Sequence, residues 1–330
     1  MNIKSLLLGS AAALAAVSGA QAADAIVAAE PEPMEYVRVC DAFGTGYFYI
    51  PGTETCLKIG GWVRAQVNFG PNVGGRSDWD ASGRGYVYFD TKNDTEYGTL
   101  AGFIALEGDV DNSTSASVNP YIDEAYLSLG GFKAGYFYNF WDKGINGETD
   151  SLGSNDLNAV QYVYDGGSFQ VGGSIDELED NDGVGAYSNG IGVEAIATVS
   201  LGGVSFDLLG GYDTELEEGA VRGLLSADVG PGTLQVAAIY ASDPNAYFST
   251  SEWTVAASYA YKATDKLTIT PAAQYWSDLA FVDGVDQWRA GVTVAYAITD
   301  GLRSLVSVRY TDPDGADDFV DGFVRLQRDF

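Results

Sequence analysis

The sequence predicts an all-β fold, a closed barrel of sixteen antiparallel strands that spans a membrane. Three observations predict it. Apolar and polar residues alternate with a period of two in sixteen separate runs. The connections between these runs alternate between short turns and longer polar loops. The 330-residue chain is rich in glycine (42) and tyrosine (21) and poor in proline (9), a composition that suits many short strands with tight turns.

The first run, residues 57–69, shows the alternation clearly. Apolar residues such as Val63 and Val67 fall on one face, and polar or basic residues such as Arg64 and Gln66 fall on the other. Successive side chains of a strand point to opposite faces, so this strand has one apolar and one polar face. The predicted strands are residues 57–69, 84–92, 99–109, 123–129, 131–138, 159–164, 169–175, 191–201, 204–212, 220–229, 233–241, 253–262, 266–276, 287–298, 302–310 and 319–330.

The connections explain why the strands are expected to close into a transmembrane barrel. Short ones such as Gly130-Gly131 and Gly202-Gly203 permit the positive φ of tight hairpin turns. An even number of alternating strands, with short turns at one end and longer loops at the other, is typical of outer-membrane barrels. Because lipid does not tolerate an unpaired strand edge, the sheet must close.

Tyrosine and tryptophan residues gather near the ends of the runs. Amphipathic rings favour the headgroup level of a membrane, so we expect them to form girdles, although aromatic residues are also good strand formers. The residues are Trp79, Tyr86, Tyr88, Tyr97, Tyr136, Tyr138, Trp141, Tyr240, Trp253, Tyr259, Tyr261, Tyr296 and Tyr310.

Residues 1–22 are predicted to be a secretory signal peptide. Lys4 supplies the positive charge, a short apolar stretch follows, and an Ala-Gln-Ala motif marks cleavage between Ala22 and Ala23. The expected organisation is a signal peptide (1–22) and a barrel domain (23–330), in which residues 23–56 are a lead-in and residues 57–330 carry the strands.

The lead-in contains the two cysteines of the chain, Cys40 and Cys56. Export places them in an oxidising compartment, and two cysteines without histidine make a poor metal site. We therefore expect a disulfide, which would close a loop of about 15 residues and stabilise the fold by about 3 kcal/mol.

Charge and composition exclude several functions. The formal net charge of −29 argues against nucleic acid or anionic lipid as a partner. The chain has no histidine, which excludes Ser-His-Asp and His-metal catalysis, and it has no phosphate-binding loop. We expect neither an enzyme nor a cofactor or metal site. Weak divalent-cation binding by the acidic loops at 109–115 and 176–183 stays open, since neither matches an EF-hand.

Residues 139–158 form the third long loop, between the fifth and sixth predicted strands. We predict that this loop folds into the bore, where its acidic residues face basic residues of the strands. Opposed charges across a narrow aqueous gap create a transverse field that orients polar solutes. An ordinary solvated surface loop is the alternative. The acidic residues are Asp142, Glu148, Asp150 and Asp156, and the basic residues are Lys58, Arg64, Arg84, Lys133, Arg303, Arg309 and Arg325.

Residues 39–64, VCDAFGTGYFYIPGTETCLKIGGWVR, closely resemble the N-terminus of alphaproteobacterial general porins. The strand pattern and the position of the third loop extend the resemblance over essentially the whole chain. The resemblance implies a homotrimer in the outer membrane of a Gram-negative cell, reached through the periplasm, whose third loop narrows each pore. It also implies that the terminal Phe330, on the apolar face, is a membrane-assembly signal.

The predicted function is that of an outer-membrane porin, a passive water-filled channel for small hydrophilic solutes and ions, surrounded by lipid. The acid excess favours a modest cation preference, although the basic residues oppose it. The alternatives are a substrate-specific channel and a plugged barrel with a structural or adhesive role. A sugar-specific channel needs an aromatic track through the bore, and the polar-face aromatic residues do not clearly form one. These are Trp62, Tyr86, Tyr88, Phe103, Tyr126 and Phe137.

Overall fold

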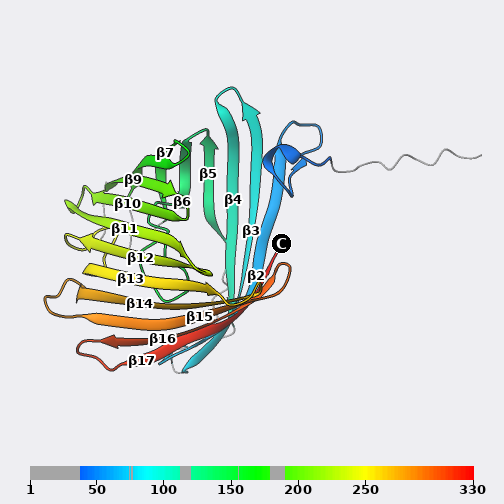
Figure 1. Cartoon of the computed structure of the whole chain (residues 1–330). Coiled ribbons are helices and arrows are strands. Elements are labelled where there is room, and N and C mark those ends of the chain that lie inside the picture. The colour runs from blue at the N-terminus through cyan, green and yellow to red at the C-terminus, as the bar shows by residue number, and fades with distance from the viewer. Residues whose placement is uncertain (1–37, 74, 76, 112–119, 155, 179–189) are drawn as a thin grey trace, which may run out of the picture. The chain divides into compact units, whose positions relative to one another are not determined.

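Sixteen antiparallel strands, β2 to β17, close into a barrel (Figure 1). The computed structural model describes residues 38–73, 75, 77–111, 120–154, 156–178 and 190–330. The unit from Val39 to Phe330 contains all the strands. They are β2 (Cys56–Phe69), β3 (Trp79–Thr95), β4 (Gly98–Asp111), β5 (Tyr121–Leu129), β6 (Phe132–Tyr138), β7 (Asp156–Asp165), β8 (Phe169–Glu177), β9 (Ile191–Leu201), β10 (Val204–Asp213), β11 (Glu218–Val229), β12 (Gly232–Ala241), β13 (Ser251–Lys262), β14 (Leu267–Leu279), β15 (Gln287–Thr299), β16 (Leu302–Pro313) and β17 (Phe319–Asp329), preceded by β1 (Phe48–Tyr49).

The ring closes where the last strand pairs with the first long one. In the register of β17 and β2, Val324 lies opposite Val67 and Arg325 lies opposite Gln66. Beyond the end of β17, the backbone N–H and C=O of Phe330 pair with Gly61, each at 3.0 Å. Every strand of the ring therefore has two neighbours, which removes the edges that an open sheet would expose.

Each of the sixteen predicted runs corresponds to one strand, and the differences lie at the ends. Strand β3 begins at Trp79, although residues 70–83 were expected to be a loop. Within this polar stretch, residues 79–83 pair one by one with the end of β2, from Trp79 opposite Phe69 to Gly83 opposite Ala65. Pairing with a long neighbour overrides its low strand propensity. The two-residue strand β1 was not predicted; it pairs with β2 at Cys56 and Leu57.

The apolar face of the strands is exposed and points outward. Val63 is 58 % exposed, Leu127 is 58 % exposed and Val324 is 50 % exposed, as suits a lipid-facing band.

Several predicted girdle residues, such as Trp253, also lie on this outer face. The prediction was wrong for Trp141, which is fully buried in the loop between β6 and β7. It was also wrong for Tyr86 and Tyr88, which share the polar face of β3 with Arg84.

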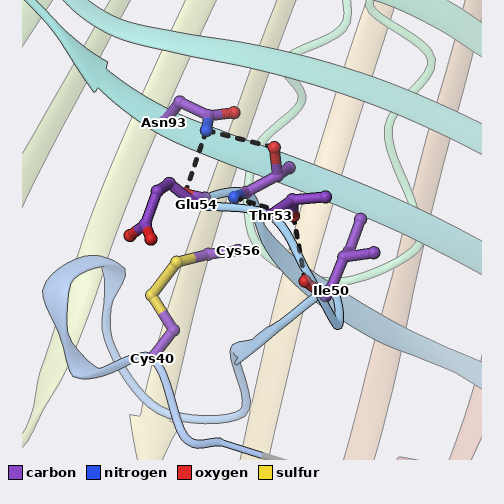
Figure 2. Close-up of a disulfide and its surroundings, with 7 residues drawn as sticks. Cys40, Ile50, Thr53, Glu54, Cys56 and Asn93 are labelled. Carbon is purple, nitrogen blue, oxygen red and sulfur yellow. Dashed lines mark hydrogen bonds between the residues drawn. A yellow bond between two sulfur atoms is a disulfide. The ribbon is translucent and has the colours of Figure 1, made fainter.

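The predicted disulfide joins Cys40 to Cys56, with 6.0 Å between their Cα atoms (Figure 2). Both cysteines are buried and pack against Tyr47. Cys56 is the first residue of β2, so the bond fastens the lead-in to the barrel. Asn93 of β3 reinforces the attachment, because its side-chain amide donates to the carbonyl oxygen of Glu54 at 3.0 Å.

Some predictions lie outside the described residues. They include the signal peptide at 1–22, its cleavage between Ala22 and Ala23, the first part of the lead-in, and parts of both acidic loops. Among the described residues, no helix is long and apolar enough to cross a membrane.

Candidate pore constriction

Residues 139–154, called the third loop below, join β6 to β7 but contact distant strands. Three backbone N–H groups of the loop donate to polar-face side chains of β12, β14 and β15. They are Asn146 N to Gln235 Oε1 at 2.6 Å, Ser151 N to Gln274 Oε1 at 2.7 Å, and Glu148 N to Thr293 Oγ1 at 3.0 Å. None of these strands neighbours β6 or β7 in the ring. The loop is therefore hydrogen-bonded to strands far from those that carry it.

Three arginines bind backbone carbonyl groups of the third loop. Arg222 of β11 donates to the carbonyl oxygens of Phe140 (2.8 Å) and Trp141 (2.7 Å). Arg309 of β16 donates to the carbonyl oxygen of Glu148 at 3.2 Å. Arg289 of β15 donates to that of Thr149 at 3.4 Å. A loop away from bulk water needs partners for its backbone, and guanidinium groups supply several donors each.

Apolar packing also holds the third loop in place. Trp141, Ile145 and Leu152 of the loop belong to one buried apolar cluster. The cluster also contains apolar residues on the otherwise polar faces of three strands, namely Leu209 of β10, Leu224 of β11 and Ile239 of β12. A second segment, between β12 and β13, contributes Tyr247 and Phe248. The polar face of a pore wall is ordinarily hydrophilic, so large apolar residues there require a cover. The third loop and the segment carrying Tyr247 provide it.

The segment carrying Tyr247 is itself anchored by a buried hydrogen bond. The Tyr247 hydroxyl donates to Asp176 Oδ2 of β8 at 2.7 Å. Burial, together with the negative charge of Asp176, raises the pKa of Tyr247, so its hydroxyl stays protonated and remains a donor at neutral pH. This bond ties a loop between β12 and β13 to a strand several positions away in the ring.

The four acidic residues predicted for the constriction have different surroundings. Glu148 alone meets a predicted basic residue, since its Oε1 lies 3.1 Å from Arg325 Nη1. Asp142 is exposed and accepts from the Ser154 hydroxyl at 2.8 Å. Asp156 belongs to β7 and accepts from the Tyr136 hydroxyl.

Asp150 turns back into the third loop instead of facing the basic residues. Its Oδ2 accepts from the backbone N–H of Ile145 at 3.3 Å. Burial raises the pKa of the Asp150 carboxyl, and this N–H donor only partly offsets the effect. The loop also carries Lys143, whose ammonium group pairs with Asp207 of β10.

Three of the predicted basic residues converge on one polar cavity. The cavity has a volume of about 260 Å³ and is lined by Arg64, Arg84 and Arg325 together with Gln66, Asn68, Ser82 and Asp109. Arg84 is neutralised by Glu107 (2.9 Å) and Asp109 (2.6 Å). Arg64 donates to the neutral Gln327, at 3.1 Å. Glu148 of the third loop meets this cluster through Arg325.

The remaining basic residues are placed differently. Arg309 pairs with Asp321 and also binds the loop, as described above. Lys58, Lys133 and Arg303 are not brought to the loop. Lys58 lies 5.8 Å from the ring centroid of Tyr47, Lys133 lies 3.8 Å from that of Phe137, and Arg303 lies 3.6 Å from Asp329.

Sequence reasoning missed Arg222 and Arg289, although the signal was present. Both fall on the polar face of a strand, as Arg309 does. It also missed apolar residues on the polar faces, such as Leu209. An apolar residue at a position where the alternation expects a polar one indicates that another segment covers it. Among the described residues, no group of three acidic, histidine or cysteine side chains is arranged to hold a metal ion.

Comparison with known proteins places the chain in a family. Residues 24–325 match a family described as the porin subfamily. Outer membrane protein y4fJ of Sinorhizobium fredii is 61 % identical over 100 % of this chain and 99 % of that protein. Outer membrane protein IIIA of Rhizobium leguminosarum bv. viciae is 46 % identical over 98 % of this chain and 93 % of that protein. Porin Omp2b of Brucella neotomae is 38 % identical over 86 % of this chain and 88 % of that protein.

Solved structures agree on the fold. The outer membrane channel DcaP of Acinetobacter baumannii superposes with a TM-score of 0.67 at 15 % identity, over 86 % of this chain and 99 % of that one. A trimer form of OmpT of Vibrio cholerae superposes with a TM-score of 0.65 at 13 % identity, over 84 % of this chain and 100 % of that one. These similarities support the barrel fold, and the family match with its closely related sequences supports the function. The chain belongs to the porin subfamily and is an outer-membrane porin.

Proposed function

We propose that the third loop narrows the bore of a passive, water-filled channel, and that small hydrophilic solutes and ions pass between the loop and the wall formed by β17, β2 and β3. The contacts of Glu148 carry this proposal. Its carboxylate meets Arg325 of β17, and its carbonyl oxygen accepts from Arg309 of β16. Both arginines lie on polar faces of strands far from β6 and β7.

The covered and the open parts of the wall support this reading. The loop packs on apolar residues of β10 to β12, whereas the cavity lined by Arg64, Arg84 and Arg325 is strongly polar. Water and solutes therefore have a hydrated route on the basic side and none through the apolar contact. Glu148 pairs with Arg325 beside that route. Glu148 and Asp142 would face Arg64 and Arg84 across it, so that the transverse field points from the arginines to the loop. Such a field favours polar solutes over apolar ones.

The porin is further proposed to act as a homotrimer in outer-membrane lipid. The outward faces carry many exposed apolar residues, of which some would meet lipid and others a second subunit. OmpT, which shares the fold, has been solved in a trimer form. Chemical cross-linking of the purified protein in mild detergent tests this point, because a ladder that ends at three copies is expected and a monomer alone would contradict it.

Planar-bilayer recording of the purified protein tests the channel itself. Ohmic current steps that occur in groups of three support three open pores in one trimer. A barrel with a plugged pore and a structural or adhesive role would give no steps. Insertion is verified independently, by flotation of the protein with liposomes, so that absence of current contradicts an open pore and cannot reflect failed insertion.

A further inference from the structure

Six aromatic rings form a continuous row across the polar faces of β2 to β6. The centroids of successive rings lie 5.5 Å (Trp62–Tyr86), 6.2 Å (Tyr86–Tyr88), 5.5 Å (Tyr88–Phe103), 5.1 Å (Phe103–Tyr126) and 5.8 Å (Tyr126–Phe137) apart. Three of these contacts are stacked, with interplanar angles of 12°, 24° and 21°. Sequence reasoning named these six residues but judged that they do not clearly form a track. The row, called the aromatic track below, depends on the register between strands.

The register explains the track. Trp62 lies directly opposite Tyr86, and Phe103 lies directly opposite Tyr126. Tyr88 and Phe103 are diagonal neighbours, since Phe103 pairs with the residue two positions beyond Tyr88. Direct and diagonal partners on one face of a sheet are within reach of aromatic side chains. A one-residue shift in any of these pairings would break the row.

A glycine makes room for the track. Gly60 lies opposite Tyr88, and a Cβ atom at this position would lie only 2.4 Å from the Tyr88 hydroxyl oxygen. Any other residue at position 60 would displace the Tyr88 ring. The tyrosine can therefore lie over the backbone of β2, where it continues the line of rings between Tyr86 and Phe103.

The track presents both apolar and polar groups. Five rings are half-buried, so each keeps part of its surface on the polar side of the wall, and only Phe137 is fully buried. Within the described parts of the chain, no protein group forms a hydrogen bond with the hydroxyl groups of Tyr86, Tyr88 and Tyr126. A cation lies at each end of the row, with Arg64 at 4.2 Å from the Trp62 ring and Lys133 at 3.8 Å from the Phe137 ring.

This surface fits a particular class of solute. A pore that only passes ions and small polar molecules needs a hydrophilic wall, and exposed rings are unfavourable there without a ligand. A pyranose ring has a flat face of C–H groups that stacks on an aromatic ring, and a rim of hydroxyl groups that bond to phenol groups beside it. A row of similar rings offers such a solute several equivalent positions. Weak binding at many sites allows passage instead of trapping.

We propose that the aromatic track binds neutral oligosaccharides made of pyranose rings and guides them through the pore. This inference rests on the proposed function, since a sugar reaches the track only through a water-filled bore. The channel then prefers sugars to other neutral solutes of equal size. Cross-strand packing of the rings for stability alone is the competing explanation, and it predicts no such preference.

The test is the block of ion current by added sugar in planar bilayers. Maltotriose is the probe, and polyethylene glycol of the same mass is the control for size. We expect maltotriose to reduce the current at a concentration at least about tenfold lower than the polymer. The double variant Tyr88→Ala/Phe103→Ala is expected to raise the half-blocking concentration of maltotriose about tenfold and to leave that of the polymer unchanged. Trp253→Ala, on the outer face, is the matched control, and maltotriose should block its current at the same concentration as that of the native protein.

Normal ion current with equal block by sugar and polymer would overturn the aromatic track and leave the channel intact. Absence of any ion current would contradict the proposed function itself. A second measurement does not depend on the double variant. Titration of the native protein with maltotriose should change its tryptophan fluorescence, and Trp62→Phe should remove that change. A native protein whose fluorescence does not respond to maltotriose would overturn the inference.

Discussion

Arg325 Nη1, on the last strand, lies 3.1 Å from Oε1 of Glu148, which precedes it by 177 residues in the chain. The same arginine donates to Gln66 of β2 at 2.6 Å. Arg325 therefore connects the third loop to the seam where the barrel closes. The loop thus reaches the seam, and the predictions below follow from that.

Glu148→Gln should shift ion preference towards anions. The substitution removes the loop carboxylate that meets the basic cluster and leaves Arg64 and Arg325 uncompensated. We expect the cation-to-anion permeability ratio to fall about twofold, or roughly 0.4 kcal/mol, the scale of one charge across a hydrated gap. The measurement is the reversal potential under a KCl gradient. Asp165→Asn, at a turn, is the control, and an unchanged ratio in Glu148→Gln would place the carboxylate away from the ion path.

Arg222→Gln should loosen the third loop. The variant leaves the carbonyl groups of Phe140 and Trp141 without their buried donors, at a cost of about 1–3 kcal/mol. Trypsin should then cleave after Lys143 at least about tenfold faster, a rate followed by mass spectrometry. Arg222→Lys should restore part of the protection. Arg328→Gln, whose native side chain donates to the carbonyl oxygens of Asp300 and Asp329, should change nothing. Equal cleavage of Arg222→Gln and the native protein would show that Arg222 does not hold the loop.

The docking of the third loop should depend on pH through Asp150. Its pKa is raised in the folded protein, so the ionised form is disfavoured there. Burial of the ionised Asp150 carboxylate lowers the stability of the folded loop. This destabilisation is fully present above the raised pKa that Asp150 has in the folded protein, and it disappears as the pH falls below the ordinary pKa of 3.8. Asp150→Asn should therefore show less open-channel noise than the native protein at pH 7, and the two should converge near pH 4. A difference that stays constant between these pH values would rule out Asp150 as its source.

Removal of the disulfide should lower the stability of the barrel and leave the conductance of the pore unchanged. Cys40→Ala/Cys56→Ala should lower the free energy of unfolding by about 3 kcal/mol, because the unfolded chain regains a loop of about 15 residues. Urea unfolding in detergent, followed by far-UV circular dichroism, measures the difference. Single-channel conductance should stay the same, since both cysteines lie in the lead-in cluster with Tyr47 and away from the third loop. An unfolding midpoint equal to that of the native protein would contradict a stabilising role.

The strands were predictable because one physical constraint acts on every one of them. Lipid on one side and water on the other impose a period of two, which Val63, Arg64 and Val67 already display in β2. The start of β3 at Trp79 was not predictable in the same way. It depends on pairing with Phe69, which a local pattern does not contain.

The candidate site was predictable in part, for a related reason. Polar parity selects Arg64, Arg84 and Arg325, which the structure brings to one cavity. Parity does not say how far along the barrel a residue lies, so Lys58 was selected although it lies beside Tyr47. The path of the loop depends on apolar contacts between distant segments. The aromatic track depends on register, so neither could be obtained from one strand at a time.

Deletion of residues 144–154 tests the central claim most directly. The third loop loses the contacts of Glu148 with Arg309 and Arg325, while the sixteen strands keep their pairing. A shorter deletion, of residues 314–317 between β16 and β17, controls for the removal of loop residues elsewhere in the barrel. Circular dichroism verifies that both variants keep the barrel. Single-channel conductance should then rise clearly in the first variant and stay near the native value in the second; native conductance in the first would show that the third loop does not narrow the pore.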